Sequence, residues 1–348
     1  IAKSEFGDFS TAVVLAETAE LLQHRVRENF QTAGSLFLAY TYSFAWKFQL
    51  QSLINPMRIG YKAGMRAGNI DYGYWCLLNY YVLLPLYTGK PLGPILARCP
   101  ECLYQMEDYQ LEDHCFYTRL SWQTCLNLTG QAQDPMQVHG GIFNDNMDEE
   151  IIPLRIATVK EVQVELWVIY GAYEQAANLA IECGDSYGKI SNLTFMCMAD
   201  TFYRGLALYA AYRDTKRGKY KKHGKRARKK LAMWEKKGVP GVVHYHALLS
   251  AEQAAVDKKY KDADLLYQKA VELAASAGYL NCAALFNERY ADFLQQNGPY
   301  FESRSDNVVF RLGESMRYYR EWGAVLKVET IGKKKMIYSS KMNLPRGA

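Results

Sequence analysis

Small residues and tyrosines recur every three or four positions between residues 244 and 294, and this pattern constrains the fold more than any other feature. Within residues 260–276 the recurring positions are Ala263, Leu266, Tyr267, Ala270, Val271, Leu273 and Ala274. Side chains at this spacing line one face of a helix, and that face must be buried. Alanines at the contact positions let neighbouring helix axes approach closely. Turns at residues 257–262 and at Gly278 divide the segment into successive helices, which is typical of stacked helical hairpins.

The same pattern occurs at two earlier places in the chain. In residues 168–185 (VIYGAYEQAANLAIECGD), Tyr173 precedes Ala176 by three residues, just as Tyr260 precedes Ala263. A looser copy occupies residues 56–84, where a helix is expected to end at Gly68-Asn69 and Asp71 offers a cap for the next one. The spacing between copies is irregular, so we predict a degenerate repeat array.

The predicted fold class is therefore all-α, a superhelical array of helical hairpins of the tetratricopeptide-like α-solenoid kind. It occupies residues 1–330, and residues 331–348 form a basic, mobile C-terminal tail. The one segment with a strand signal is residues 325–331. Loops are expected at residues 88–94, 130–153, 184–191, 237–241 and 297–306, and none has the composition of an interdomain linker.

Composition favours a soluble protein of a reducing compartment. Hydrophobic residues make up 49% of the chain and charged residues 22%, which is the balance of a folded soluble protein. The longest apolar stretches, residues 36–46 and 75–87, fall short of the ~20 residues that a bilayer core requires. The eight cysteines are scattered through apolar helical segments, where free cysteine packs as a small hydrophobe. We therefore expect a cytoplasmic location.

Two segments carry a resemblance to a known family. The first is HYHALLSAEQAAVDKKYKDADLLYQKAVELAASAGYLNCAALFNERYADFL, and the second is ESMRYYREWGAVLKVE. Together they resemble the tetratricopeptide-like region of large multidomain signalling proteins, which join a serine/threonine-kinase-like domain and an AAA-type ATPase to sensor histidine-kinase modules. Two upstream stretches, RAGNIDYGYWCLLNYYVLLPLYTGKPL and GGIFNDNMDEEIIPLR, extend the resemblance to residues 40–327. It implies a helical connector and docking platform whose own residues are not catalytic.

Positive charge is concentrated in one segment. Residues 213–237 contain 13 Lys/Arg and two acids, a local charge of +11, whereas the whole chain carries +6, so the remainder carries about −5. The main interpretation is the solvated face of an amphipathic helix with Leu231 and Trp234 turned inward. The alternatives are docking of an acidic protein partner, a nucleic acid or an anionic membrane, the last two being less favoured. The candidate partner-binding residues are Lys216, Arg217, Lys219, Lys221, Lys222, Lys225, Arg226, Arg228, Lys229 and Lys230.

Three other motifs suggest chemistry but lack its full pattern. Cys99 and Cys102 have the spacing of a zinc or redox pair, yet no second pair follows, and residues three apart also share the buried face of a helix. Residues 184–191 (GDSYGKIS) lack the glycine spacing of a phosphate loop and are read as a helix-ending turn. Residues 145–150 (DNMDEE) lack the spacing of a calcium loop and are read as an acidic loop that caps the next helix.

These observations predict a protein that holds other proteins and is not an enzyme. Our leading hypothesis is a non-catalytic interaction scaffold, related to the connector region of a signalling ATPase or kinase, with an inner groove lined by tyrosines and small residues. The alternative is a structural subunit held permanently in a large assembly, with the basic helix against an acidic or nucleic-acid neighbour. We expect no metal, cofactor or small-molecule substrate.

Overall fold

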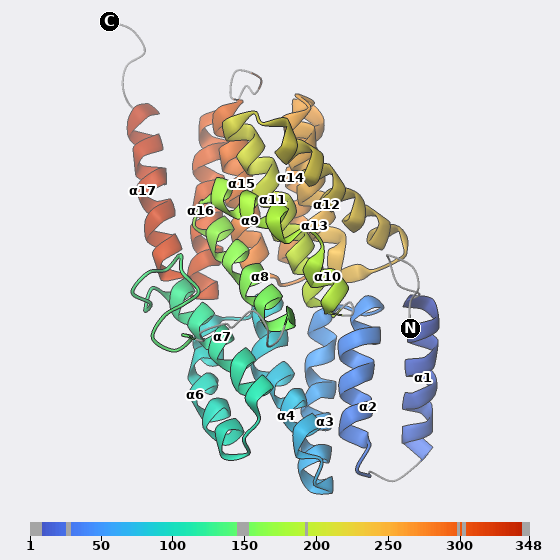
Figure 1. Ribbon diagram of the computed structural model, residues 1–348. Coiled ribbons are helices and arrows are strands. Elements are labelled where there is room, and N and C mark those ends of the chain that lie inside the picture. The colour runs from blue at the N-terminus through green and yellow to red at the C-terminus, as the bar shows by residue number, and fades with distance from the viewer. Residues whose placement is uncertain are drawn as a thin grey trace, which may run out of the picture.

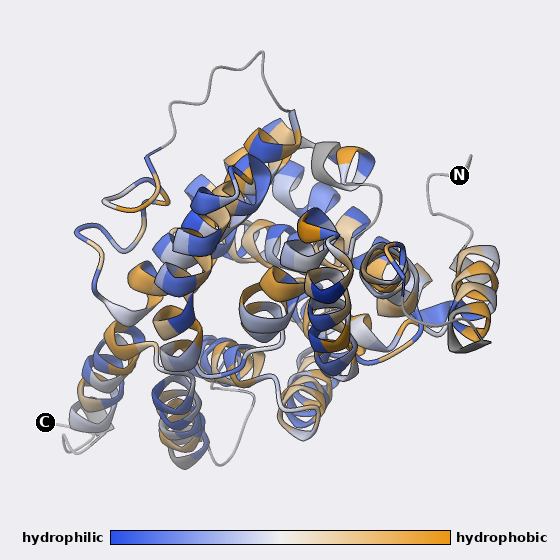
Figure 2. Ribbon diagram, turned by 90° about the horizontal axis from the view of Figure 1, so that it is seen from below, coloured by the Kyte–Doolittle hydropathy of each residue, from blue (hydrophilic) through white to orange (hydrophobic). Residues whose placement is uncertain are grey.

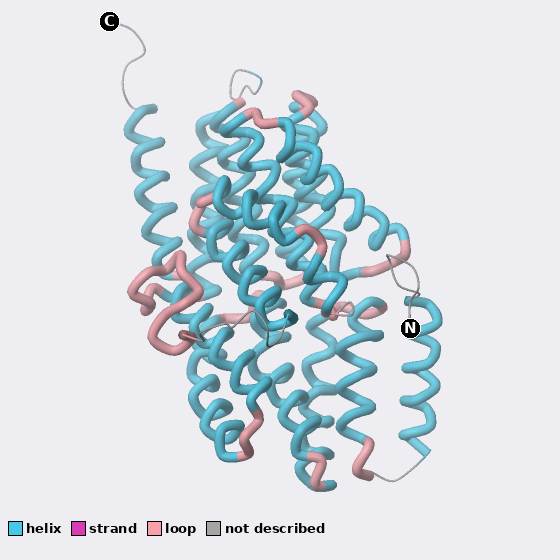
Figure 3. The backbone as a smooth tube through the Cα atoms, viewed as in Figure 1, coloured by secondary structure: helices cyan, strands magenta, loops and turns pink. Residues whose placement is uncertain are grey.

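The computed structural model describes residues 9–25, 29–144, 153–191, 194–297, 300 and 304–342. Every regular element in these ranges is a helix, and Figure 3 shows helices joined by turns and loops. The prediction of an all-α fold is confirmed. The acidic segment 145–150 lies outside the described residues.

The N-terminal half consists of the helices up to residue 129. Its α-helices are α1 (Phe9–Arg25), α2 (Thr32–Leu38), α3 (Ile54–Ala67), α4 (Ile70–Leu78), α5 (Leu84–Tyr87), α6 (Leu92–Asp108) and α7 (Glu112–Thr129). Short π and 3-10 segments join them: η1 (Ala39–Ser43), η2 (Phe44–Trp46), η3 (Leu50–Leu53) and η4 (Asn79–Leu83). A loop with no regular element follows α7 as far as Asn144.

The C-terminal half contains longer helices. They are α8 (Pro153–Ile169), α9 (Tyr173–Cys183), α10 (Ser186–Ile190), α11 (Met196–Thr215), α12 (Gly218–Lys236), η5 (Pro240–Val242), α13 (Val243–Val256), α14 (Tyr260–Ser276), α15 (Leu280–Gln296), α16 (Arg304–Trp322) and α17 (Val325–Met342). Helix α11 is central, because residues 196–203 and 205–211 are all buried against α8, α9, α12 and α13.

Helices adjacent in sequence pack as antiparallel neighbours, most extensively α3 with α4, α6 with α7, α11 with α12, α13 with α14 and α15 with α16. The pattern that predicted the hairpins corresponds to the observed packing. Ala263, Tyr267, Ala270 and Ala274 of α14 are completely buried, and the Tyr267 ring stacks at 5.4 Å on Tyr290 of α15. The tyrosines therefore fill the spaces that the alanines leave between helices.

The two halves share one hydrophobic core. Figure 1 shows α1–α7 below α8–α17, and contacts between residues distant in sequence join them. The Trp46 and Trp234 rings meet at 5.1 Å, and the Gln51 side-chain amide donates a hydrogen bond of 2.9 Å to the Ala277 carbonyl. Because these contacts cross from η2 and η3 to α12 and the residue that follows α14, the N-terminal half is fixed against the C-terminal half.

The C-terminal predictions need correction. Residues 325–331, predicted as a short strand, begin α17, and residues 331–342, predicted as a mobile tail, continue that helix. The reason is that Ala324 and Ile331 are fully buried and Lys327 reaches the buried Glu288 carboxylate at 2.8 Å. Residues 343–348 lie outside the described part. The expected turn at Gly184 is present, but the short helix α10 follows it.

Close approach of α3 and α4 depends on Gly64. A Cβ atom at this position would lie 2.7 Å from the Gly73 Cα and 2.9 Å from the Asn69 carbonyl oxygen. Both are backbone atoms, which cannot relieve the clash by changing rotamer. We expect Gly64→Ala to lower the free energy of unfolding by ~1–3 kcal/mol. Gly93→Ala in α6 is the matched control, because nothing lies within 4 Å of its Cβ position. Urea unfolding of both variants tests the packing, and equal stability would contradict it.

Candidate functional site

Helix α12 carries most of the predicted basic patch, and its inner face is apolar. Tyr220, Leu231 and Trp234 are completely buried, and Gly224 lies flat against the Tyr209 ring, which its missing side chain allows. Burial of Leu231 and Trp234 was predicted from the sequence, and it is confirmed. The helix is thus attached through one face, and its lysines and arginines occupy the remaining surface.

Six of the ten predicted patch residues bond to the protein itself. Arg217 contacts Glu174 at 2.6 Å, Lys221 contacts Asp257 at 2.8 Å, and Lys230 contacts Asp185 at 2.7 Å. The other three also donate to protein groups: Lys216 to the Arg213 carbonyl, Lys219 to Asn178 and Arg228 to Gln253. Five of them attach α12 to α9, to the C-terminal end of α13 and to the turn between α9 and α10, whereas the Lys216 bond lies within the C-terminal end of α11.

The remaining four residues form what we call the α12 stripe: Lys222, Lys225, Arg226 and Lys229. Within the described part of the chain, no acidic group lies within ion-pair distance of any of them. With Gly218 and Lys221 they line a shallow depression of about 440 Å³. The predicted patch therefore divides into a set that bonds to the protein and the α12 stripe, in which Lys222, Arg226 and Lys229 are exposed and Lys225 is half-buried.

The charge of the α12 stripe also acts on its neighbours. Partial burial lowers the pKa of His223, and the positive charges of Arg226 and Lys222 lower it further. Lys225 contributes to holding the pKa of Asp257 below its ordinary value, an effect due mainly to Lys221. The potential along this side of α12 is therefore positive, and an anionic group that approaches it meets favourable electrostatics.

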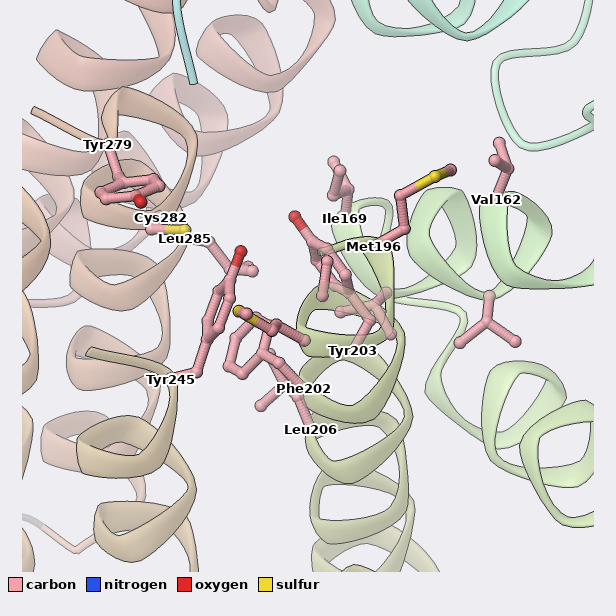
Figure 4. Close-up of a cluster of buried hydrophobic side chains, with 14 of the residues drawn as sticks. Val162, Ile169, Met196, Phe202, Tyr203, Leu206, Tyr245, Tyr279, Cys282 and Leu285 are labelled. Atoms are coloured by element: carbon pink, nitrogen blue, oxygen red, sulfur yellow. The ribbon is translucent and has the colours of Figure 1, made fainter. Parts of the chain in front are cut away.

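A second candidate site lies inside the molecule, where the two halves meet. Residues of α5, α7, α8, α11, α13 and α15 enclose a cavity of about 20 Å³, with Tyr87, Tyr117, Tyr203 and Tyr245 among its lining. In Figure 4, Tyr203 and Tyr245 project from opposing helices towards this region. These tyrosines surround a space the size of one or two water molecules, which is too small to be the partner-binding groove expected from the sequence.

Glu165 of α8 lines this cavity, and its carboxyl group acts electrostatically on Glu161 of α8, as does that of Asp200 of α11. Burial raises the pKa of Glu165 to about 7. Burial likewise raises the pKa of Glu161 well above its ordinary value, and the negative charges of Asp200 and Glu165 raise it further. The hydrogen bond that the Tyr87 hydroxyl donates to the Glu161 carboxylate lowers this pKa only in part. Burial also raises the pKa of Asp200, although this carboxylate forms an ion pair with Arg204. This group was not predicted from the sequence, where its signal was two glutamates four residues apart in the apolar second half of α8.

The cysteine motif has a structural role. Cys99 and Cys102 are buried in α6, and burial raises the pKa of Cys102 to about 11. His114 stacks on Trp75 at 4.1 Å and contacts the Asp71 carbonyl, so it packs in the α4–α7 contact. In the described residues, no three His, Cys, Asp or Glu side chains are grouped closely enough to hold a metal ion. Nor does any described helix have the length and apolarity to cross a bilayer.

The buried carboxyl groups predict a pH dependence of stability. Between pH ~4.5 and ~7 the unfolded chain loses the Glu165 proton while the folded chain keeps it, so folding stability falls as pH rises through this window. The loss assigned to Glu165 is ~3 kcal/mol. We expect Glu165→Gln to remove this part of the loss between pH 5 and pH 8 in urea unfolding. Glu329→Gln, on the exposed surface of α17, is the control and should leave the pH profile unchanged.

The chain was also compared with known proteins. No family model and no curated protein sequence matches it. The resemblance inferred from residues 40–327 therefore stays a prediction, and the function has to be argued from the two sites described above.

Proposed function

We propose that this protein is a non-catalytic interaction scaffold that docks an acidic segment of another protein on the α12 stripe. The observation that carries the proposal is the division of the basic run: five cations attach α12 to its neighbours, whereas the four residues of the α12 stripe have no acidic partner within ion-pair distance among the described residues. A tetratricopeptide-like superhelix, and a relation to the connector of signalling ATPases and kinases, belong to the same proposal. The architecture of stacked hairpins supports it, because such arrays present extended surfaces to partners.

The geometry of the α12 stripe favours an acidic polypeptide over other anionic partners. Lys222, Arg226 and Lys229 lie one turn apart along about 10 Å of one helix face, which matches carboxylates at similar spacing on a partner helix. The depression beside them has no aromatic side chain in its lining, so it offers no platform on which nucleic-acid bases could stack. The apolar face of α12 is buried in the protein, and it cannot insert into a membrane.

Binding of defined anionic probes tests the proposal on the whole chain. We expect polyglutamate to bind more tightly than a single-stranded oligonucleotide or vesicles containing phosphatidylserine. Affinity for polyglutamate should fall steeply with ionic strength, because exposed charges are screened within about 10 Å at 0.1 M salt. Tighter binding of the oligonucleotide would overturn the assignment of an acidic protein partner and favour the nucleic-acid alternative. Tighter binding of the vesicles would overturn it in favour of a membrane surface.

A charge-reversal variant tests the position of the site. We expect K222E/R226E/K229E to weaken polyglutamate binding at least ~10-fold and to reduce its salt dependence. The matched control is K62E/K90E/K269E, which changes the net charge by the same amount. Its three positions are exposed, on α3, in the loop that follows α5, and on α14. Equal losses in both variants would show that net charge, not the α12 stripe, attracts the probe. Circular dichroism verifies that both variants remain helical.

A further inference from the structure

Helices α12 and α13 meet along a seam of polar side chains. Figure 2 shows hydrophilic and hydrophobic residues alternating along the helices, because each helix turns one face to the core. In α13 the polar residues His246, Ser250 and Gln253 are four and three positions apart, so they lie on one face. This face contacts α12, since His246 bonds to Glu235 and Gln253 accepts a hydrogen bond from Arg228.

Three side chains in the seam are connected in the order serine, histidine, carboxylate. The Ser250 Oγ lies 3.2 Å from the His246 Nε2, and the His246 Nδ1 contacts the Glu235 carboxylate. A carboxylate can only accept a hydrogen bond, so Nδ1 carries the ring proton and Nε2 of the neutral imidazole is left as an acceptor. The Ser250 hydroxyl therefore donates to Nε2, which is the hydrogen bond between a nucleophile and its general base.

The Arg228 guanidinium lies beside the same ring nitrogen. Its Nη1 is 3.3 Å from the His246 Nε2. Its Nε donates a hydrogen bond of 2.7 Å to the Gln253 Oε1, which also accepts one of 3.0 Å from the Tyr209 hydroxyl. The guanidinium is thus fixed next to the Ser250 hydroxyl. When an oxygen attacks a carbonyl carbon, negative charge develops on the carbonyl oxygen, and a fixed cation at this place stabilises it.

A serine four residues after a histidine on a helix is often only a structural hydrogen bond. Two observations favour a chemical role here. Glu235 comes from a different helix and orients the far side of the imidazole, and the group is open to solvent, with the His246 and Glu235 side chains 20% and 34% exposed. The group does not line the interior cavity, so its surface position suits a short ester without a bulky acyl chain.

We propose that Ser250 is a reactive nucleophile that accepts an acyl group from a short activated ester, with His246 as its general base and Glu235 orienting that base. The Ser250 Oγ forms a bond to the carbonyl carbon while its proton passes to the His246 Nε2. The bond from the carbonyl carbon to the leaving oxygen then breaks, the leaving alcohol takes the proton from the imidazole, and the acyl group stays on Ser250. This modification of the protein itself goes beyond the proposed function, because it uses no residue of the α12 stripe.

A fluorophosphonate ester tests the reactivity of Ser250 in the whole chain. The attacking serine oxygen displaces fluoride from phosphorus, and the serine proton passes to the histidine. We expect the wild-type chain to be labelled on the peptide that contains Ser250, as located by mass spectrometry, and S250A to remain unlabelled there. The control is S276A, which removes an exposed α14 hydroxyl that donates to the Leu273 carbonyl, and it should be labelled like the wild type. A wild-type chain without label on Ser250 would overturn the proposal.

Substitution of Glu235 distinguishes an activated serine from an ordinary surface hydroxyl. We expect E235Q to lower the rate of labelling at least ~10-fold, because a neutral amide neither fixes the ring proton on Nδ1 nor stabilises the imidazolium. A purely structural role of Glu235 would change thermal unfolding and leave the labelling rate at its wild-type value, and that result would contradict the assignment.

Reaction with p-nitrophenyl acetate tests the class of acyl donor. We expect an acetyl group on Ser250 of the wild-type chain and none at this residue in H246Q, because Gln lacks the basic ring nitrogen. Thermal unfolding establishes that H246Q remains folded. A chain that takes the fluorophosphonate but no acetyl group on Ser250, or H246Q acetylated there like the wild type, would overturn the proposal.

Discussion

The structure depends on the close approach of helix backbones at positions without large side chains. Gly64 lies against Gly73 where α3 crosses α4, and Gly224 lies against the Tyr209 ring where α12 crosses α11. At Gly205 of α11, an added Cβ would meet a Leu249 methyl carbon of α13 at 2.4 Å. Because dispersion attraction falls steeply with distance, these short separations allow the tyrosines and leucines beside each crossing to be packed without voids. Close crossings of this kind also bring distant helices together around a single core.

The closely packed interior also contains charged groups, which bond to one another. Arg289 is fully buried and donates to Glu252 at 3.0 Å and to the Tyr173 hydroxyl at 3.0 Å, so its charge is satisfied across α9, α13 and α15. Burial alone would raise the pKa of Glu252, but Arg213 and Arg289 hold it below its ordinary value. Glu165 has no cation in that position, and its pKa rises instead. The balance between burial and neighbouring cations therefore decides the direction of the pKa shift: two arginines outweigh burial at Glu252, whereas burial outweighs Arg204 at Asp200.

The basic segment around α12 contains cations with two different structural roles. Arg217, Lys221 and Lys230 are used to hold α12 on its neighbours, whereas Lys222, Arg226 and Lys229 on the same helix have no such use. The two sets overlap along the sequence, because residues a few positions apart on a helix point in different directions. Net charge alone could not have separated them. The two sets are distinguished by whether an acidic residue of α9, of the turn after α9 or of the end of α13 lies within ion-pair distance.

Part of this protein was determined by its sequence alone. The three and four residue spacing of Ala263, Tyr267, Ala270 and Ala274 predicts a helix with one buried face, and the inward position of Leu231 and Trp234 follows from the same periodicity, because it depends only on local helix geometry. The tertiary structure decided which residues meet across the chain. Residues 331–342 are helical because α17 gains contacts with α16 and α7, and Glu165 lines a small cavity because residues from both halves of the chain meet beside it. Such outcomes depend on contacts between residues far apart in sequence, which periodicity cannot encode.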